Sequence, residues 1–234
     1  MDQPILFEYT SAAVPIIDEL KPTFLSYDEN NFIQTPSLLI QYIHISQGKR
    51  INQNLRNATS HVFYVLDGEG TTIYLNGEIH WKQGDVFTLP SYNLHAIHRC
   101  SEDSILFYAN DSPLLNFLHV NPSKPRFLPT HYKCDIMLKQ IEDFNNEEDA
   151  KIRNRNGILL SNKRMVEEKL NTLTHTMWSL LNSISPDCLV PKTSPGPLNS
   201  RSFSAIKNPS SVSLIVLSLN LPTSLIFFPY IRMQ

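Results

Sequence analysis

Turn signals divide the stretch 37–120 into a series of short β-type runs. Asn76-Gly77 is a strong hairpin signal, because both central residues of a type I′ turn need a positive φ angle. Another turn is indicated by DGEG at 67–70, which directly follows the apolar run HVFYVL at 61–66. The runs show no helical period of useful length. This pattern predicts an antiparallel, all-β domain, either a sandwich or a small barrel.

The predicted strands are apolar on both faces. In HVFYVL, Phe63 and Val65 lie on one face, and Val62, Tyr64 and Leu66 lie on the other. Strands of this kind must be covered on both sides. We therefore expect a filled barrel with an outer layer, supplied by N-terminal strands or by a second copy of the chain, and we expect a homo-oligomer.

Charge and cysteine usage exclude several classes of protein. With 20 Lys and Arg against 22 Asp and Glu, the net charge of -2 gives no basic footprint for nucleic acid. The cysteines Cys100, Cys134 and Cys188 form no CxxC pair, which argues against a structural zinc site and favours a reducing compartment. The N-terminal arm, 1–34, has acids where a signal peptide needs bases, so a cytoplasmic location is expected.

The C-terminal part of the chain differs in composition. Residues 121–171 are predicted to be a linker with short helices at about 131–144 and 161–173, the second with Ser161 as a candidate N-cap. From Cys188 onward the chain contains no Asp or Glu. Residues 193–234 are expected to be a low-complexity or irregular tail, whose apolar run is interrupted by Asn220 and prolines and is not expected to span a membrane.

The order of motifs from His61 to His98 resembles the cupin family, and within it the two-barrel (bicupin) enzymes similar to gentisate 1,2-dioxygenase. The resemblance rests on VLDGEG after an apolar strand, an NG hairpin, KQGDVFTLP, and a histidine five residues after the proline. It covers about residues 35–120, the predicted cupin barrel, and implies a double-stranded β-helix fold. It also implies Fe(II) bound by histidines near the barrel mouth, where oxygen and an aromatic ring are activated together.

The resemblance assigns metal-ligand positions residue by residue. Counting back from GEG, the HxH positions hold Leu55 and Asn57, His61 falls on the glutamate position, and His95 falls on the second-motif histidine. Leucine has no donor atom, and a neutral amide oxygen is a poor ligand for iron. The candidate metal ligands are therefore His61 and His95, with Asn57 as a weak third ligand. His44 and water are alternatives for that third position.

The other histidines receive simpler interpretations. His98 is expected to point to the face of its strand opposite to His95 and to be exposed, like His80 and His119. If no metal binds, His61 and His95 are expected to be neutral, hydrogen-bonded residues at the barrel mouth.

A second barrel is expected to begin at residues 172–192 and to remain incomplete. THTMWSLLNSISPDCLVPK resembles the strand and loop that lead to a second HxH motif, but TSPGPLNSRSFS follows without His, Asp or Glu. A truncation or a shifted reading frame is our hypothesis for this change in composition.

The sequence is compatible with three functions. The first is a gentisate-dioxygenase-like oxidoreductase, impaired or inactive because the HxH ligands are missing, with Arg56, Tyr64 and Tyr92 as candidate substrate-binding residues for a small aromatic acid. The second is a metal-free cupin that binds a small molecule or dimerises. The third is a membrane-tethered barrel that uses the C-terminal apolar run.

Overall fold

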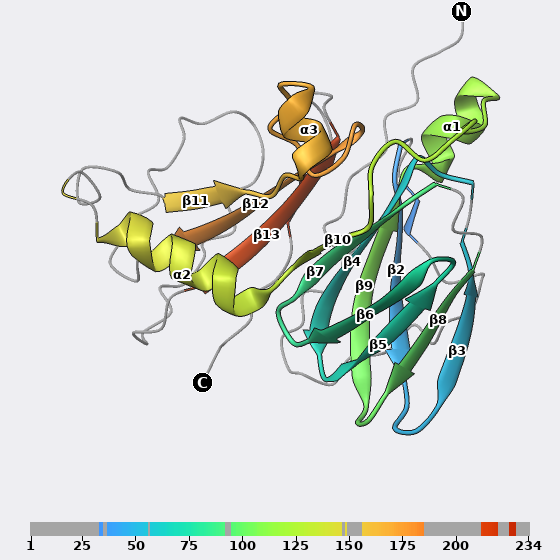
Figure 1. The fold of residues 1–234 in the computed structure, drawn as a ribbon, viewed down its shortest axis with the longest axis horizontal. Helices are drawn as coiled ribbons and strands as arrows, with labels where there is room; N and C mark the ends of the chain where they lie inside the picture. The colour runs from blue at the N-terminus through green and yellow to red at the C-terminus, as the bar shows by residue number, and fades with distance from the viewer. Residues whose placement is uncertain are drawn as a thin grey trace, which may run out of the picture.

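Two antiparallel sheets face each other in the N-terminal half, and a third sheet lies beside them (Figure 1). The structure is a computed structural model that describes residues 33–34, 37–55, 57–91, 95–146, 148, 156–184, 212–219 and 225–227. The order in the six-stranded sheet is β1 (Ile33–Gln34), β2 (Leu39–Ile45), β9 (Ser104–Asn110), β4 (Ser60–Asp67), β7 (Val86–Pro90) and β10 (Thr130–Tyr132). The facing four-stranded sheet has the order β3 (Arg50–Asn54), β8 (His95–Cys100), β5 (Glu69–Tyr74) and β6 (Gly77–Lys82). The predicted antiparallel β domain is confirmed.

The hairpin between β5 and β6 forms at the predicted place but with a different turn. Tyr74 pairs with Gly77, so the two loop residues are Leu75 and Asn76. Neither has a positive φ angle, so the predicted type I′ turn over Asn76-Gly77 is wrong. The glycine serves close packing instead, because a Cβ atom at Gly77 would lie 2.8 Å from the Tyr74 hydroxyl oxygen.

The space between the two facing sheets is filled by apolar side chains. Phe63 on β4 stacks on Phe87 of β7 and on Tyr108 of β9, with ring centroids 4.7 and 4.8 Å apart. The other buried members of this inner cluster are Leu39, Ile43, Ile45, Leu55, Val65, Ile79, Trp81, Leu89, Ala96, Cys100 and Leu106. The barrel is therefore a packed core rather than an open tube.

The outer face of the six-stranded sheet is covered by a later part of the same chain. Alternate residues of its strands, such as Val62, Tyr64 and Phe107, pack in one cluster with Met137 and Met177. The covering elements are α2 (Cys134–Asn145), β11 (Asn156–Leu159), β12 (Met177–Ile184) and the segment around α3 (Lys163–Glu167). Cover on both sides of the six-stranded sheet is as expected, and among the described residues this C-terminal unit supplies it in place of N-terminal strands.

Asp85 fastens the covering unit to the turn between β6 and β7. Its carboxylate accepts hydrogen bonds from the Cys134 backbone N–H at 2.8 Å, from His131 Nε2 at 2.8 Å and from the Lys82 backbone N–H at 3.2 Å. Burial by itself raises the pKa of Asp85, but these hydrogen bonds and the nearby His131 outweigh it and hold the pKa below its ordinary value. A carboxylate at the first turn of α2 also complements the helix dipole.

The helices agree with the sequence in part. The helix α2 overlaps the range predicted at about 131–144, but Ile136 is exposed and Met137 is buried with Ile141 on the packed face. Ser161 is not the N-cap of α3, because the Asn162 side chain accepts the hydrogen bond from the Met165 N–H. The unpredicted elements include α1 (Ser112–Leu118), directly after β9, and β10 within the proline-rich connector. The strands β1, β3 and β11 were not predicted either.

The third sheet has the order β11-β12-β13-β14, with β13 (Val212–Leu219) and β14 (Leu225–Phe227). These two segments are strands, whereas an irregular tail is predicted there from composition. The strand β12 was expected, and it pairs with β13 along its whole length, from Met177 with Leu219 to Ile184 with Val212. Among the residues described, no helix is long and apolar enough to cross a membrane.

Candidate functional site

The candidate site is the mouth of the barrel, the end of the two facing sheets at which β4 and β8 begin and β3, β7 and β9 end. At this end the chain passes from β3 to β4 and from β7 to β8, whereas the passages from β2 to β3, β4 to β5, β6 to β7 and β8 to β9 lie at the other end. The helix α1 follows β9 at this same end (Figure 1).

His61 lies at the mouth on the inner face of β4. It is 1% exposed and shares a 2.9 Å hydrogen bond between Nδ1 and the Tyr108 hydroxyl, and the two rings stack at a centroid distance of 6.0 Å. Burial lowers the pKa of His61 to about 3, so the imidazole is neutral at pH 7. His61 is thus a buried, hydrogen-bonded imidazole at the barrel mouth.

The two positions assigned to an HxH motif have other partners. Leu55 is 7% exposed and belongs to the inner apolar cluster. Asn57 is exposed, and its amide nitrogen donates to the Val120 carbonyl at 3.4 Å and to Asn121 Oδ1. The first side chain therefore contributes to the core, and the second fastens the β3–β4 loop to the segment after α1.

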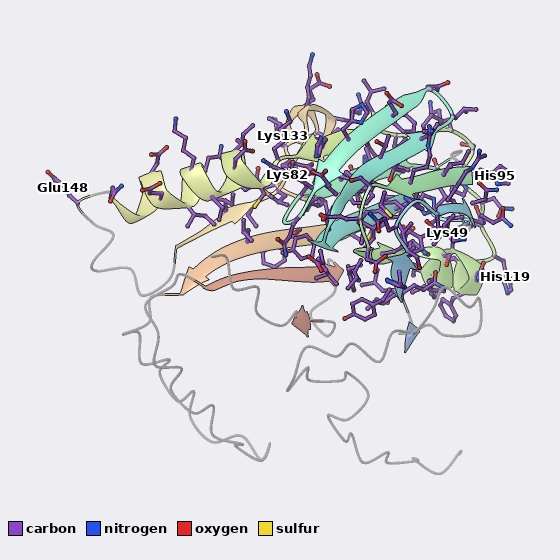
Figure 2. All side chains as sticks on the ribbon, turned by 90° about the horizontal axis from the view of Figure 1, so that it is seen from below. Lys49, Lys82, His95, His119, Lys133 and Glu148 are labelled. Atoms are coloured by element: carbon purple, nitrogen blue, oxygen red, sulfur yellow. The ribbon has the colours of Figure 1, made fainter. Side chains whose placement is uncertain are left out.

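His95 is exposed and His98 is buried, which is the reverse of what the sequence predicts. His95, the first residue of β8, is exposed and lies at the edge of the barrel on the side away from α2 (Figure 2). His98 is 0% exposed and lies inside the barrel. Because side chains alternate along a strand, Ala96, His98 and Cys100 form the inner set of β8. The expectation that His98 is exposed is wrong, whereas His80 and His119 are exposed as expected.

The donor set at the mouth does not fit a metal centre. A non-haem iron site needs three protein ligands on one face, but His61 is inside the barrel and His95 is exposed. His44 pairs with Ile105 near the opposite end of the sheet, so it lies far along β2 from the mouth. Within the described ranges, no three His, Cys, Asp or Glu side chains are grouped closely enough to hold a metal ion.

The candidate substrate-binding residues are not assembled at the mouth in the described part of the chain. Tyr64 is buried on the outer face of β4, in the cluster shared with α2, and burial raises the pKa of its phenol. Arg56 and Tyr92 lie outside the described residues.

A buried polar chain that no sequence pattern indicates crosses the inner face of the four-stranded sheet. His98 Nε2 lies 2.9 Å from Gln53 Oε1, and His98 Nδ1 lies 2.8 Å from Thr72 Oγ1. The Trp81 indole N–H donates to the same Thr72 oxygen at 2.8 Å. Because an amide oxygen only accepts, Nε2 carries the proton and Nδ1 accepts from the Thr72 hydroxyl. Burial lowers the pKa of His98 to about 3, so this chain contains a neutral imidazole.

A second buried network joins the mouth to the C-terminal unit. The Asp111 carboxylate, 0% exposed, accepts hydrogen bonds from the Thr59 N–H at 2.8 Å, from the Thr59 hydroxyl, and from the Thr176 hydroxyl at 2.8 Å. Next to it, the Ser60 hydroxyl donates to Thr174 Oγ1 at 3.1 Å. In the sequence, this place is marked only by the polar residues Asn110, Asp111 and Ser112 at the end of an apolar run.

An open cleft of about 410 Å³ lies at the other end of the barrel, near the β4–β5 and β6–β7 turns and the start of α2. Its wall carries acids such as Glu69 and Glu102, and Lys82 lies 3.9 Å from Asp135 in an exposed ion pair. The ion pair is exposed to solvent, so it contributes little to stability.

Comparison with known proteins identifies solved structures with a similar fold. No family model matches the chain. A 65-residue stretch, 28% of this chain, is 32% identical to 5-aminosalicylate 1,2-dioxygenase from Comamonas sp and covers 17% of that enzyme. The solved structure of salicylate 1,2-dioxygenase from Pseudaminobacter salicylatoxidans matches 64% of this chain with a TM-score of 0.51 and 10% identity. A variant of that enzyme matches with the same TM-score and 11% identity.

The match covers 53% of the solved enzyme, so this chain spans about half the length of that relative. At such low identity the likeness shows the fold, which agrees with the strand order and the packed interior described above. The chain therefore has the cupin fold, a double-stranded β-helix barrel with short flanking helices.

Proposed function

We propose that this chain is a metal-free cupin of the ring-cleaving dioxygenase type, which binds a small aromatic acid at its mouth and does not cleave the ring. The single observation that carries the proposal is the state of the two HxH positions. Leu55 is part of the inner apolar cluster, and the Asn57 amide nitrogen is held by Val120 and Asn121. Neither side chain supplies an imidazole, and His95 is exposed.

The aromatic-acid part of the proposal is supported by two kinds of likeness. One is the 32% identity to a dioxygenase named for 5-aminosalicylate, and the other is the fold shared with a salicylate dioxygenase. Gentisate, the acid suggested by the motif order, belongs to the same class of hydroxylated benzoic acids. A cytoplasmic location and a homo-oligomeric state are part of this proposal.

The test is to purify the protein without chelator, measure its metal content, and then follow oxygen uptake after addition of Fe(II) and either gentisate, salicylate or 5-aminosalicylate. We expect a metal-to-protein ratio near zero, no oxygen uptake, and binding of at least one of these acids in calorimetry. Light scattering on the same sample gives the oligomeric state.

The competing function, an iron-dependent ring-cleaving enzyme, makes the opposite prediction. Bound iron that disappears in the His95→Ala variant, together with oxygen uptake by the wild-type protein, would establish it. The His119→Ala variant is the matched control, because His119 is also an exposed histidine but has no assigned ligand position.

A further inference from the structure

The segment that leads from α1 to β10 exposes large apolar side chains at the mouth end of the barrel. Four of them are half or more exposed, namely Phe117 (77%), Leu118 (53%), Val120 (50%) and Leu128 (82%). A fully exposed side chain of this size offers on the order of 150 Å², so the four together expose roughly 400 Å² of apolar surface. An apolar patch of this size on a single chain is often an interaction site.

The same segment carries positive charge and no negative charge. Lys124 and Arg126 are exposed, and neither forms an ion pair with another described residue, whereas Lys82 and Arg164 do. Between residues 111 and 135 the sequence contains no Asp or Glu. Because the whole chain has a net charge of -2, the sign of the charge is reversed locally here. The mouth-end patch consists of Phe117, Leu118, Val120, Lys124, Arg126 and Leu128.

Hydrogen bonds and buried anchors hold this segment against the barrel. The Asn57 amide donates to the Val120 carbonyl at 3.4 Å, and the Ser91 hydroxyl donates to the Lys124 carbonyl at 3.1 Å. The anchors are Leu115 and Phe127, which are 4% and 6% exposed. Figure 1 shows α1 at the end of the barrel, and in Figure 2 the residue that follows it, His119, lies at the end of the molecule away from α2. The patch is therefore presented at one end of the domain.

We propose that the mouth-end patch binds an anionic lipid surface, with its apolar side chains in the outer part of the bilayer and its two bases against the headgroups. Exposed Phe and Leu beside Lys and Arg are the combination that attracts a protein to such a surface. A folded protein partner needs a surface of matching shape, whereas a fluid lipid layer adapts to side chains that stand out. The anionic leaflet faces the cytoplasm, which is the location proposed above.

The test is co-sedimentation of the full chain with vesicles of phosphatidylcholine, either alone or with about one-third phosphatidylserine. We expect binding only to vesicles that contain phosphatidylserine, and binding at least about tenfold weaker when NaCl is raised from about 0.05 to 0.5 M. Leu128→Ser should weaken binding at least about fivefold and Lys124→Glu at least about tenfold. Ile136→Ser and Lys139→Glu, similar changes at exposed residues of α2, are the matched controls and should bind like the wild-type protein.

A second measurement locates the surface that touches the lipid. In Phe117→Trp, fluorescence of the added indole should be quenched by brominated phosphatidylcholine in the vesicles, whereas in Ile136→Trp it should not. Failure to sediment with phosphatidylserine vesicles, or wild-type binding by both Leu128→Ser and Lys124→Glu, would overturn the inference. So would a dimer that Leu128→Ser dissociates in the absence of vesicle binding, because the patch would then belong to a second copy. None of these results affects the proposed function, which involves neither the patch nor a membrane.

Discussion

Acid should destabilise this protein because the barrel contains two neutral, buried histidines. His98 has no place for a second proton: Nε2–H already faces the Gln53 oxygen, and Nδ1 accepts from the Thr72 hydroxyl. Protonating Nδ1 would leave that hydroxyl proton without an acceptor and would bury a charge with no carboxylate partner in the network. His61, 1% exposed, is likewise held neutral at the mouth.

The size of the effect follows from the pKa values. Each of these pKa values is about 3 in the folded protein, against the ordinary value of 6.5. Below pH 6.5 the unfolded chain binds protons that the folded protein does not, so stability is lost as the pH falls from 6.5 toward 3. Between pH 7.5 and pH 5.0 each histidine should remove about 2 kcal/mol from the free energy of unfolding, about 4 kcal/mol for the pair.

Urea unfolding at pH 7.5, 6.5 and 5.0 measures this loss. The His98→Gln and His61→Phe variants should each lose about half of the wild-type pH dependence, whatever their absolute stability. His80→Gln is the control, since the His80 side chain is 73% exposed, and it should keep the full dependence. An equal free energy of unfolding at pH 7.5 and 5.0 in the wild-type protein would refute the reasoning.

Three further substitutions test the contacts that fix the fold. Asp85→Asn should destabilise the protein by about 2 kcal/mol at pH 7, because the charge at the start of α2 is lost. Because the pKa of Asp85 is lowered in the folded protein, the difference in stability between wild type and variant should shrink in urea melts below about pH 4. Gly70→Ala should cost about 2 kcal/mol or more in thermal unfolding, because the added Cβ would lie 2.6 Å from the Trp81 ring. Thr176→Val removes a donor from the buried Asp111 carboxylate and should cost about 1–3 kcal/mol by urea unfolding, and an unchanged stability would show that this network does not hold the C-terminal unit.

Most strands of the barrel were predicted from local sequence signals, with β1, β3 and β10 as the exceptions. Turn residues and the double-sided apolar runs are local signals, and they located β2 and β4 through β9 and required cover on both faces. The Asn76-Gly77 hairpin was located correctly, although its turn residues were not. Local signals also predicted α2, because its apolar spacing depends only on neighbouring residues.

Strand pairing fixes which histidine lies inside the barrel. A change of one residue in register turns every side chain of a strand to the other face, and the sequence contains no local signal that distinguishes His95 from His98. The pairing of β8 with β3 and β5 fixes this register, which puts His98 against Thr72 and leaves His95 exposed.

The tertiary structure also decided the chemistry of the mouth and the source of the outer layer. The partners of Asp111 and of Asn57 come from segments more than fifty residues away, so no pattern of adjacent residues indicates them. The count from GEG already showed that Leu55 and Asn57 are not ordinary metal ligands. Only the packing shows what these side chains do instead, because hydrogen bonds and core contacts depend on segments that are brought together by folding.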